Sequence, residues 1–302
     1  MGPPRHANLL VVATAALALA QSAPAASLSA AGLAQASTEI PDQAVLNVTQ
    51  PVGPIVQGTS AGSAIADTEG VVHAQVDYGL ISLSASCEAR LPTPPPIGGD
   101  IVLGSGNVVG EWSDEFTLLP PTPALAGQPA TIVINLLLHG IGTADGASAN
   151  PSGTFASYRL DVKIGTCVSG CAFAQLGTWT DNGTAGGGLV FTGDPVTGLV
   201  GVSVPVVFSL PIPLDVKLTV DAQAIASSDV FATASGDFGH TLAWGGISEV
   251  RDAQQNVVTG YSVTSGSGVD WSQSVPEPGY GALTGIALMS VAAMRATRGM
   301  RR

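Results

Sequence analysis

Cys167 and Cys171 are a pair of residues whose types and spacing could do chemistry. They flank Val168-Ser169-Gly170, and a three-residue hairpin with the glycine in the left-handed position would bring the two sulfurs face to face. A metal site and a pairing of either residue with Cys87 are the alternatives. Cys87 stands on the apolar face of its own segment, so we expect a buried thiol there.

Two glycine-containing motifs resemble catalytic or cofactor loops. Gly58-Thr59-Ser60-Ala61-Gly62 matches G-x-S-x-G, but that nucleophile needs a turn between a strand and a helix. Pro51 and Pro54 precede the motif and no helical pattern follows, which argues against a catalytic Ser60. Gly104-Ser105-Gly106, followed by Gly110, has the spacing of a dinucleotide loop, but the next residues alternate as a strand does. We interpret it as a hairpin turn.

Other residue types with chemical potential are scattered. The histidines His73, His139 and His240 form no i, i+4 pair, and His73 shares the polar face of its segment with Gln75 and Asp77. We therefore expect His73 to be an ordinary solvated residue. The sequence predicts no catalytic residue, no metal and no cofactor.

Asp114 and the aromatic residues leave two points open. Asp114 is the one acid on an otherwise apolar face, so it needs a partner if it is buried. Four aromatic rings could form a sugar-stacking platform, although packing in a core or rim is the commoner use of each. These rings are Trp179, Trp244, Tyr261 and Trp271.

Alternation with a period of two residues organises the central part of the chain. In Ile81–Glu88 every odd position is apolar and every even one polar, as a strand with one dry face requires. Similar patterns occur in 108–118, 156–164 and 214–224, and more continuous apolar runs in 132–138 and 200–208. We predict a linker over 26–39 and then one all-β body over 40–274. That body is predicted to be a single antiparallel β-sandwich of about nine to eleven strands.

Charge excludes one class of partner. Only 11% of the residues are charged, and the formal net charge is −12. Without Arg5, Glu277 and the four C-terminal arginines, 21 acids and 5 bases remain, a net charge of −16. Such a surface repels phosphate backbones, so nucleic acid is excluded as an expected partner.

The N-terminal residues 1–25 have the layout of a cleavable secretory leader. Arg5 precedes the apolar run Leu9–Ala20, and Ala23-Pro24-Ala25 supplies a small-x-small cleavage site. The apolar run is too short to span a bilayer, which needs about 20 residues. We predict export and cleavage after Ala25.

The C-terminal residues 275–302 combine three elements in order. Pro276-Glu277-Pro278 is followed by the mainly apolar 281–294 and then by four arginines, which are Arg295, Arg298, Arg301 and Arg302. This arrangement resembles the PEP-CTERM sorting signal that exosortases recognise. Polar Thr284 and Ser290 and the spaced arginines depart from the commonest pattern. The block formed by 238–247 and 260–271 also resembles, faintly, the end of many β-rich bodies that carry such tails.

The resemblance implies a route and a class of function. Signal peptidase and an exosortase would process the chain, and residues 281–294 would hold it transiently in the inner membrane. The mature protein would then be non-catalytic and sit at the cell surface or in an exopolysaccharide matrix. Export also favours a Cys167–Cys171 disulfide. A carbohydrate-binding β-sandwich and a secreted hydrolase are the alternative functions.

Overall fold

The structure of this chain is a computed structural model that describes most of the body. The described residues are 26–37, 42–51, 53–63, 68–90, 101–146, 154–165, 175–180, 185–187, 189–194, 198–227 and 231–275. Within them every regular element is a β-strand, apart from one turn of 3-10 helix at Pro123–Leu125. The predicted all-β, antiparallel fold is confirmed, because every strand pairing is antiparallel.

The strands form two sheets of eight. The first sheet, in spatial order, contains β11 (Ala185–Gly187), β10 (Gln175–Thr180), β9 (Phe155–Ile164), β14 (Pro211–Ser227), β6 (Ile101–Leu119), β1 (Ser27–Ser37) and β2 (Asp42–Gln50), with β16 (Ser262–Ser265) also paired to β6. The second contains β12 (Val190–Asp194), β13 (Leu199–Val207), β7 (Pro129–Leu138), β15 (Phe231–Asp252), β5 (Leu80–Arg90), β4 (Thr68–Asp77) and β3 (Ile55–Ser63), with β8 (Ile141–Gly146) also paired to β15.

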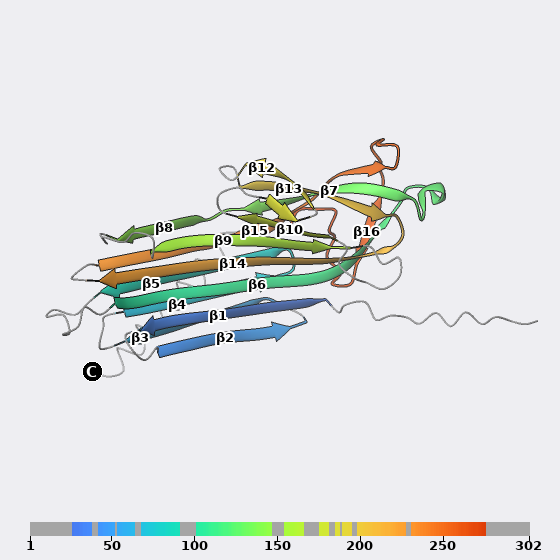
Figure 1. Ribbon diagram of the computed structural model, residues 1–302. Coiled ribbons are helices and arrows are strands. Elements are labelled where there is room, and N and C mark those ends of the chain that lie inside the picture. The colour runs from blue at the N-terminus through green and yellow to red at the C-terminus, as the bar shows by residue number, and fades with distance from the viewer. Residues whose placement is uncertain are drawn as a thin grey trace, which may run out of the picture.

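The two sheets lie against each other and bury the core between them. β4 and β5 of the second sheet contact β6 of the first, and β1 also contacts β4 (Figure 1). Along each strand the buried residues alternate with exposed or half-buried ones, as in β5, where Ile81, Leu83, Ala85 and Cys87 are buried. The sequence alternation had assigned these four residues to the apolar face, so that prediction is confirmed. The more continuously apolar runs 132–138 and 200–208 belong to β7 and β13, which lie inside the second sheet, each between two other strands.

The inward side chains grow in size from one end of the molecule to the other. On β6 the inward positions include Val102, Gly104 and Gly106 near one end and Trp112 and Phe116 near the other. The antiparallel neighbour β14 runs the opposite way, from Ile212 and Leu214 down to small residues, which are Ala222, Ala224 and Ala226. The small ends of both strands therefore coincide, and the space between the sheets narrows toward them.

Glycines allow the two backbones to touch at the narrow end. A Cβ on Gly104 would lie 2.5 Å from the carbonyl oxygen of Glu88 on the facing sheet, and one on Gly70 would meet the backbone of Ser105. The interpretation of Gly104–Gly106 as a hairpin turn is therefore wrong. These glycines lie inside the 19-residue strand β6, and they are needed for close approach of the sheets rather than for a change of direction.

Two further expectations differ from the structure. The predicted linker over 26–39 contains β1, which lies between β2 and β6 and buries Leu28, Ala30, Ala34 and Ala36. Its small residues look unstructured in the sequence, but they match the narrow part of the core. The described residues form sixteen strands, more than the nine to eleven predicted, because short strands such as β11 and β12 carry no detectable alternation.

Candidate functional site

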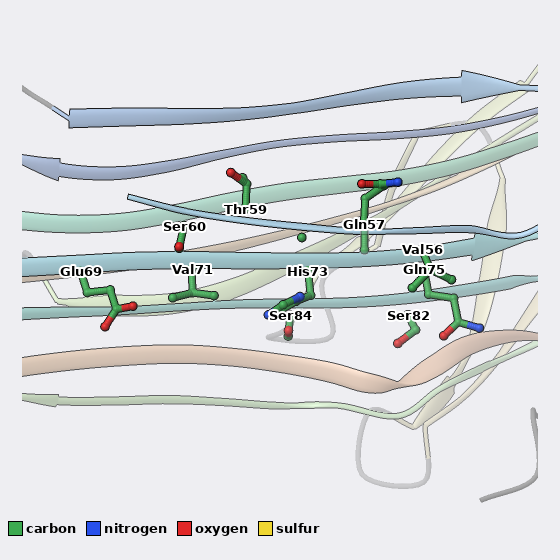
Figure 2. Close-up of a pocket in the computed structure, with 12 residues that line it drawn as sticks. Val56, Gln57, Thr59, Ser60, Glu69, Val71, His73, Gln75, Ser82 and Ser84 are labelled. Atoms are coloured by element: carbon green, nitrogen blue, oxygen red, sulfur yellow. The ribbon is translucent and has the colours of Figure 1, made fainter. Parts of the chain in front are cut away.

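A concavity in the described part of the chain lies on the outer face of the second sheet. It has a volume of about 610 Å³ and is formed by β3, β4 and β5 (Figure 2). Its lining is mostly polar and uncharged, and consists of Val56, Gln57, Gly58, Thr59, Ser60, Glu69, Val71, His73, Ala74, Gln75, Ser82 and Ser84. We call this concavity the outer groove.

His73 occupies the middle of the outer groove. Strand register places it between Gly58 on β3 and Ser84 on β5, and Figure 2 shows its ring next to Ser84. The imidazole lies over Gly58, because a Cβ on that glycine would overlap the ring at Nδ1. Gln75 and Asp77 share this face of β4, and His73 is exposed, as the sequence predicted. Glu69 lies toward one end of the groove, while Gln75 and Ser82 lie toward the other.

Ser60 does not stand on a nucleophile elbow. Its G-x-S-x-G motif lies inside the extended strand β3, where Ser60 pairs with Val71. A nucleophile elbow needs a sharp turn into a helix. Within the described part of the chain, no hydrogen bond joins Ser60 to His73, although both line the same groove.

The aromatic residues gather in the core at the wide end of the molecule. Trp112 stacks on Trp271 with ring centroids 4.8 Å apart, and Trp244 meets both rings edge-on. All three are at most 1% exposed. Trp244 and Trp271 are therefore core residues and cannot stack on a sugar. Half-buried Tyr261 donates its hydroxyl to the carbonyl of Ile247, and the side chain of Trp179 lies outside the described residues.

Asp114 is buried at the edge of this tryptophan cluster and has the partners that burial requires. Its Oδ2 accepts hydrogen bonds from Trp271 Nε1 at 2.6 Å and from Ser267 Oγ at 2.5 Å. Its Oδ1 accepts from the backbone N–H groups of Glu115 and Ser267. The carboxylate thus links the segment after β16 to the C-terminal part of β6. This points to a structural role, because both carboxylate oxygens already accept two hydrogen bonds each.

Several ion-paired side chains lie on the outer face of the first sheet. Asp161 and Asp215 are only 4% and 5% exposed, and they pair with Arg159 and Lys163 respectively. Burial first, and neighbouring Asp215 second, raise the pKa of the half-buried Glu111 carboxyl. Alternation alone placed Asp215 on a wet face and gave no sign of this carboxylate pair. The cross-strand register of β6, β9 and β14 brings Glu111 and Asp215 together.

Comparison with protein-family models, with curated proteins and with solved structures finds no match to this chain.

The remaining predicted sites divide between described and undescribed residues. Cys87 is a free, buried thiol, as predicted, and burial raises its pKa to about 12. Cys167, Cys171, the leader and the whole sorting motif from Pro276 to Arg302 lie outside the described residues. Among the described residues, no group of three metal-ligating side chains converges, and no helix is long and apolar enough to cross a membrane.

Proposed function

We propose that this chain is an exported, non-catalytic β-sandwich protein of the cell surface or extracellular matrix, sorted through its PEP-CTERM tail. The observation that carries the proposal is the C-terminal order of Pro276-Glu277-Pro278, an apolar run and four arginines. Each element has a physical role in such a signal. The prolines keep the chain extended, the apolar run stops in the membrane, and the arginines hold its end on the cytoplasmic side.

The end of the folded body supports this proposal. Val275 donates its backbone N–H to the carbonyl of Trp244 at 2.9 Å and lies against Gly79. The next residue is Pro276. The Pro-Glu-Pro motif follows this contact directly in the sequence, so under the proposal the sorting enzyme would act next to the folded body.

The test compares processing of the wild-type chain with a Pro276→Ala, Glu277→Ala, Pro278→Ala variant in a host that has an exosortase. We expect the variant to be exported, because the leader is unchanged, and to accumulate as an uncut membrane form. Immunoblots of membrane and surface fractions measure this. A chain truncated after Ser274, which has no tail to cut, is the control. The sorting proposal fails if mature wild type keeps Arg302 or if the variant is processed normally.

The matrix association we propose uses the outer groove. Its hydroxyl and amide side chains, with the exposed imidazole of His73, can donate and accept hydrogen bonds to a hydroxyl-rich polymer. Val56 and Val71 supply apolar contact for sugar C–H groups. An acidic body disfavours an acidic polymer, so the proposed ligand class is a neutral polysaccharide.

Affinity electrophoresis in gels that contain dextran tests this association. We expect dextran to retard the wild-type chain, and His73→Ala with Gln75→Ala to abolish most of the retardation. Gln254→Ala, an exposed change in the turn after β15, should migrate as wild type does. Alginate gels should retard none of the three. If wild type migrates equally with and without dextran, the groove is not a neutral polysaccharide site.

A further inference from the structure

On one side of the molecule, two long strands have no second pairing partner among the described residues. β2 ends the first sheet and β3 ends the second, and the two strands contact each other along the lower side of Figure 1. Each is nine residues long and pairs with its inner neighbour without a bulge. On the opposite side the final strands β11 and β12 have only three and five residues.

These two edges lack the features that keep sheet edges apart. Proteins protect exposed edges with charged side chains, prolines, bulges or very short strands. β3 has no charged residue or proline, and the only charge on β2 is Asp42 at its first position. The opposite side is protected by short strands. The difference between the two sides indicates that β2 and β3 are open for pairing.

Exposed apolar side chains mark the same edges. Val45 on β2 is 72% exposed and Val56 on β3 is 63% exposed, more than any other large apolar residue in the described part of the chain. Together with the unpaired backbone groups, they make this side of the molecule the most favourable place for association.

We propose that β2 and β3 form a dimer interface with a second copy of this chain. One two-fold rotation perpendicular to the sheets would pair β2 with the second β2 and β3 with the second β3, both antiparallel. Each eight-stranded sheet would thereby continue into its counterpart.

Charge selects a second copy over a different partner. The body carries a net charge of −16 once the two terminal segments are set aside, so most of its faces repel each other. Two copies can pair along β2 and β3 without placing one carboxylate opposite another. A charged partner would find nothing complementary there, whereas identical edges match each other in length and polarity.

The size of the interface is sufficient for specific association. Nine residues of strand extend roughly 30 Å, and two packed sheets are about 20 Å thick with their outer side chains. Each copy would bury about 600 Å², so the total of about 1,200 Å² lies at the lower end of specific interfaces. We therefore expect a dissociation constant in the micromolar range, which is about 1–10 µM.

Sedimentation of the purified full chain in mild detergent tests the proposal. The variant Val45→Lys, Asn47→Lys, Thr49→Lys places like charges along exposed positions of β2, and we expect it to raise the dimer dissociation constant at least about tenfold. Val257→Lys changes a 57% exposed valine away from the edge and should leave the dimer intact. Association through the apolar tail would be equal in all three proteins.

Cross-linking gives a second readout that does not depend on the triple variant folding. In Val45→Cys a short bismaleimide should join two copies, whereas wild type with its native cysteines sets the background. A wild-type chain that remains monomeric at about 100 µM, a triple variant that folds and still dimerises, or no cross-link above background would each overturn the proposal. None of these measurements depends on processing of the sorting tail, so either proposal can fail alone.

Discussion

At the scale of single residues, Asp114 shows how a polar side chain can organise an apolar core. A buried carboxylate is costly unless its oxygens accept hydrogen bonds, and Asp114 accepts four. Three of the four donor groups belong to Ser267 and Trp271, which lie in the segment that ends at Val275. The hydrogen bonds therefore hold the last part of the body in place, next to the start of the proposed sorting signal.

Asp114→Asn should destabilise the protein by about 2–3 kcal/mol. The amide keeps one acceptor but turns an NH₂ group toward a group that also donates, such as Trp271 Nε1. Urea unfolding followed by tryptophan fluorescence measures the change. Asp252→Asn is the matched control, because Asp252 also accepts backbone N–H bonds, but at an exposed site. Equal effects of the two changes would contradict the structural role of buried Asp114.

The sequence predicted that a buried Asp114 needs hydrogen-bond partners, but not which residues these are. A lone acid among Trp112, Phe116 and Leu118 indicates a polar group that must be satisfied. Ser267 is 153 positions away and sits in a segment with no regular pattern. Nothing local could identify it, because the contact exists only after β16 pairs with β6.

At the scale of elements, the main device is a gradient of side-chain size along antiparallel strands. Large inward residues stand at one end of β6 and at the opposite end of β14, so they meet at the same end of the molecule. This gradient is visible in the sequence once the strands are known. At the end with small residues, the sequence instead predicts a linker in 26–39 and a turn at Gly104–Gly106, because small residues also favour irregular structure.

Gly104→Ala should destabilise the protein by about 1–3 kcal/mol, since the added methyl group would push against the backbone of Glu69 and Glu88 on the facing sheet. Thermal unfolding followed by circular dichroism measures this. Gly62→Ala is the matched control on the edge strand β3, where a Cβ would meet only Thr68 O at 3.7 Å. The control should change stability by less than about 0.5 kcal/mol. A harmless Gly104→Ala would show that the sheets do not touch there.

At the scale of the whole molecule, the charged residues and the uncharged polar and apolar residues occupy different surfaces. The outer face of the first sheet places three of the body's basic residues among acids; these are Arg159, Lys163 and Lys217. The outer groove and the β2–β3 edges carry mostly neutral polar and apolar groups instead. The proposed polysaccharide and dimer contacts both use this uncharged surface.

The sequence by itself determined that the body is built of strands and which face of many strands is buried. It could do so because a strand has only two faces, and alternation of apolar and polar residues assigns them without knowledge of the neighbours. The faces of Ile81 to Cys87 and of Leu214 to Ala222 followed directly. The two terminal signals are equally local patterns, and they remain predictions.

Only the tertiary structure decided which strands pair and which side chains the pairing brings together. The Glu111–Asp215 pair and the tryptophan cluster each join segments that are distant in sequence, whereas the outer groove is formed by the consecutive strands β3, β4 and β5. Trp271 and Asp114, for example, are 157 positions apart. Pairing between distant strands depends on the register and packing of the whole sheet, and a local pattern carries no information about either.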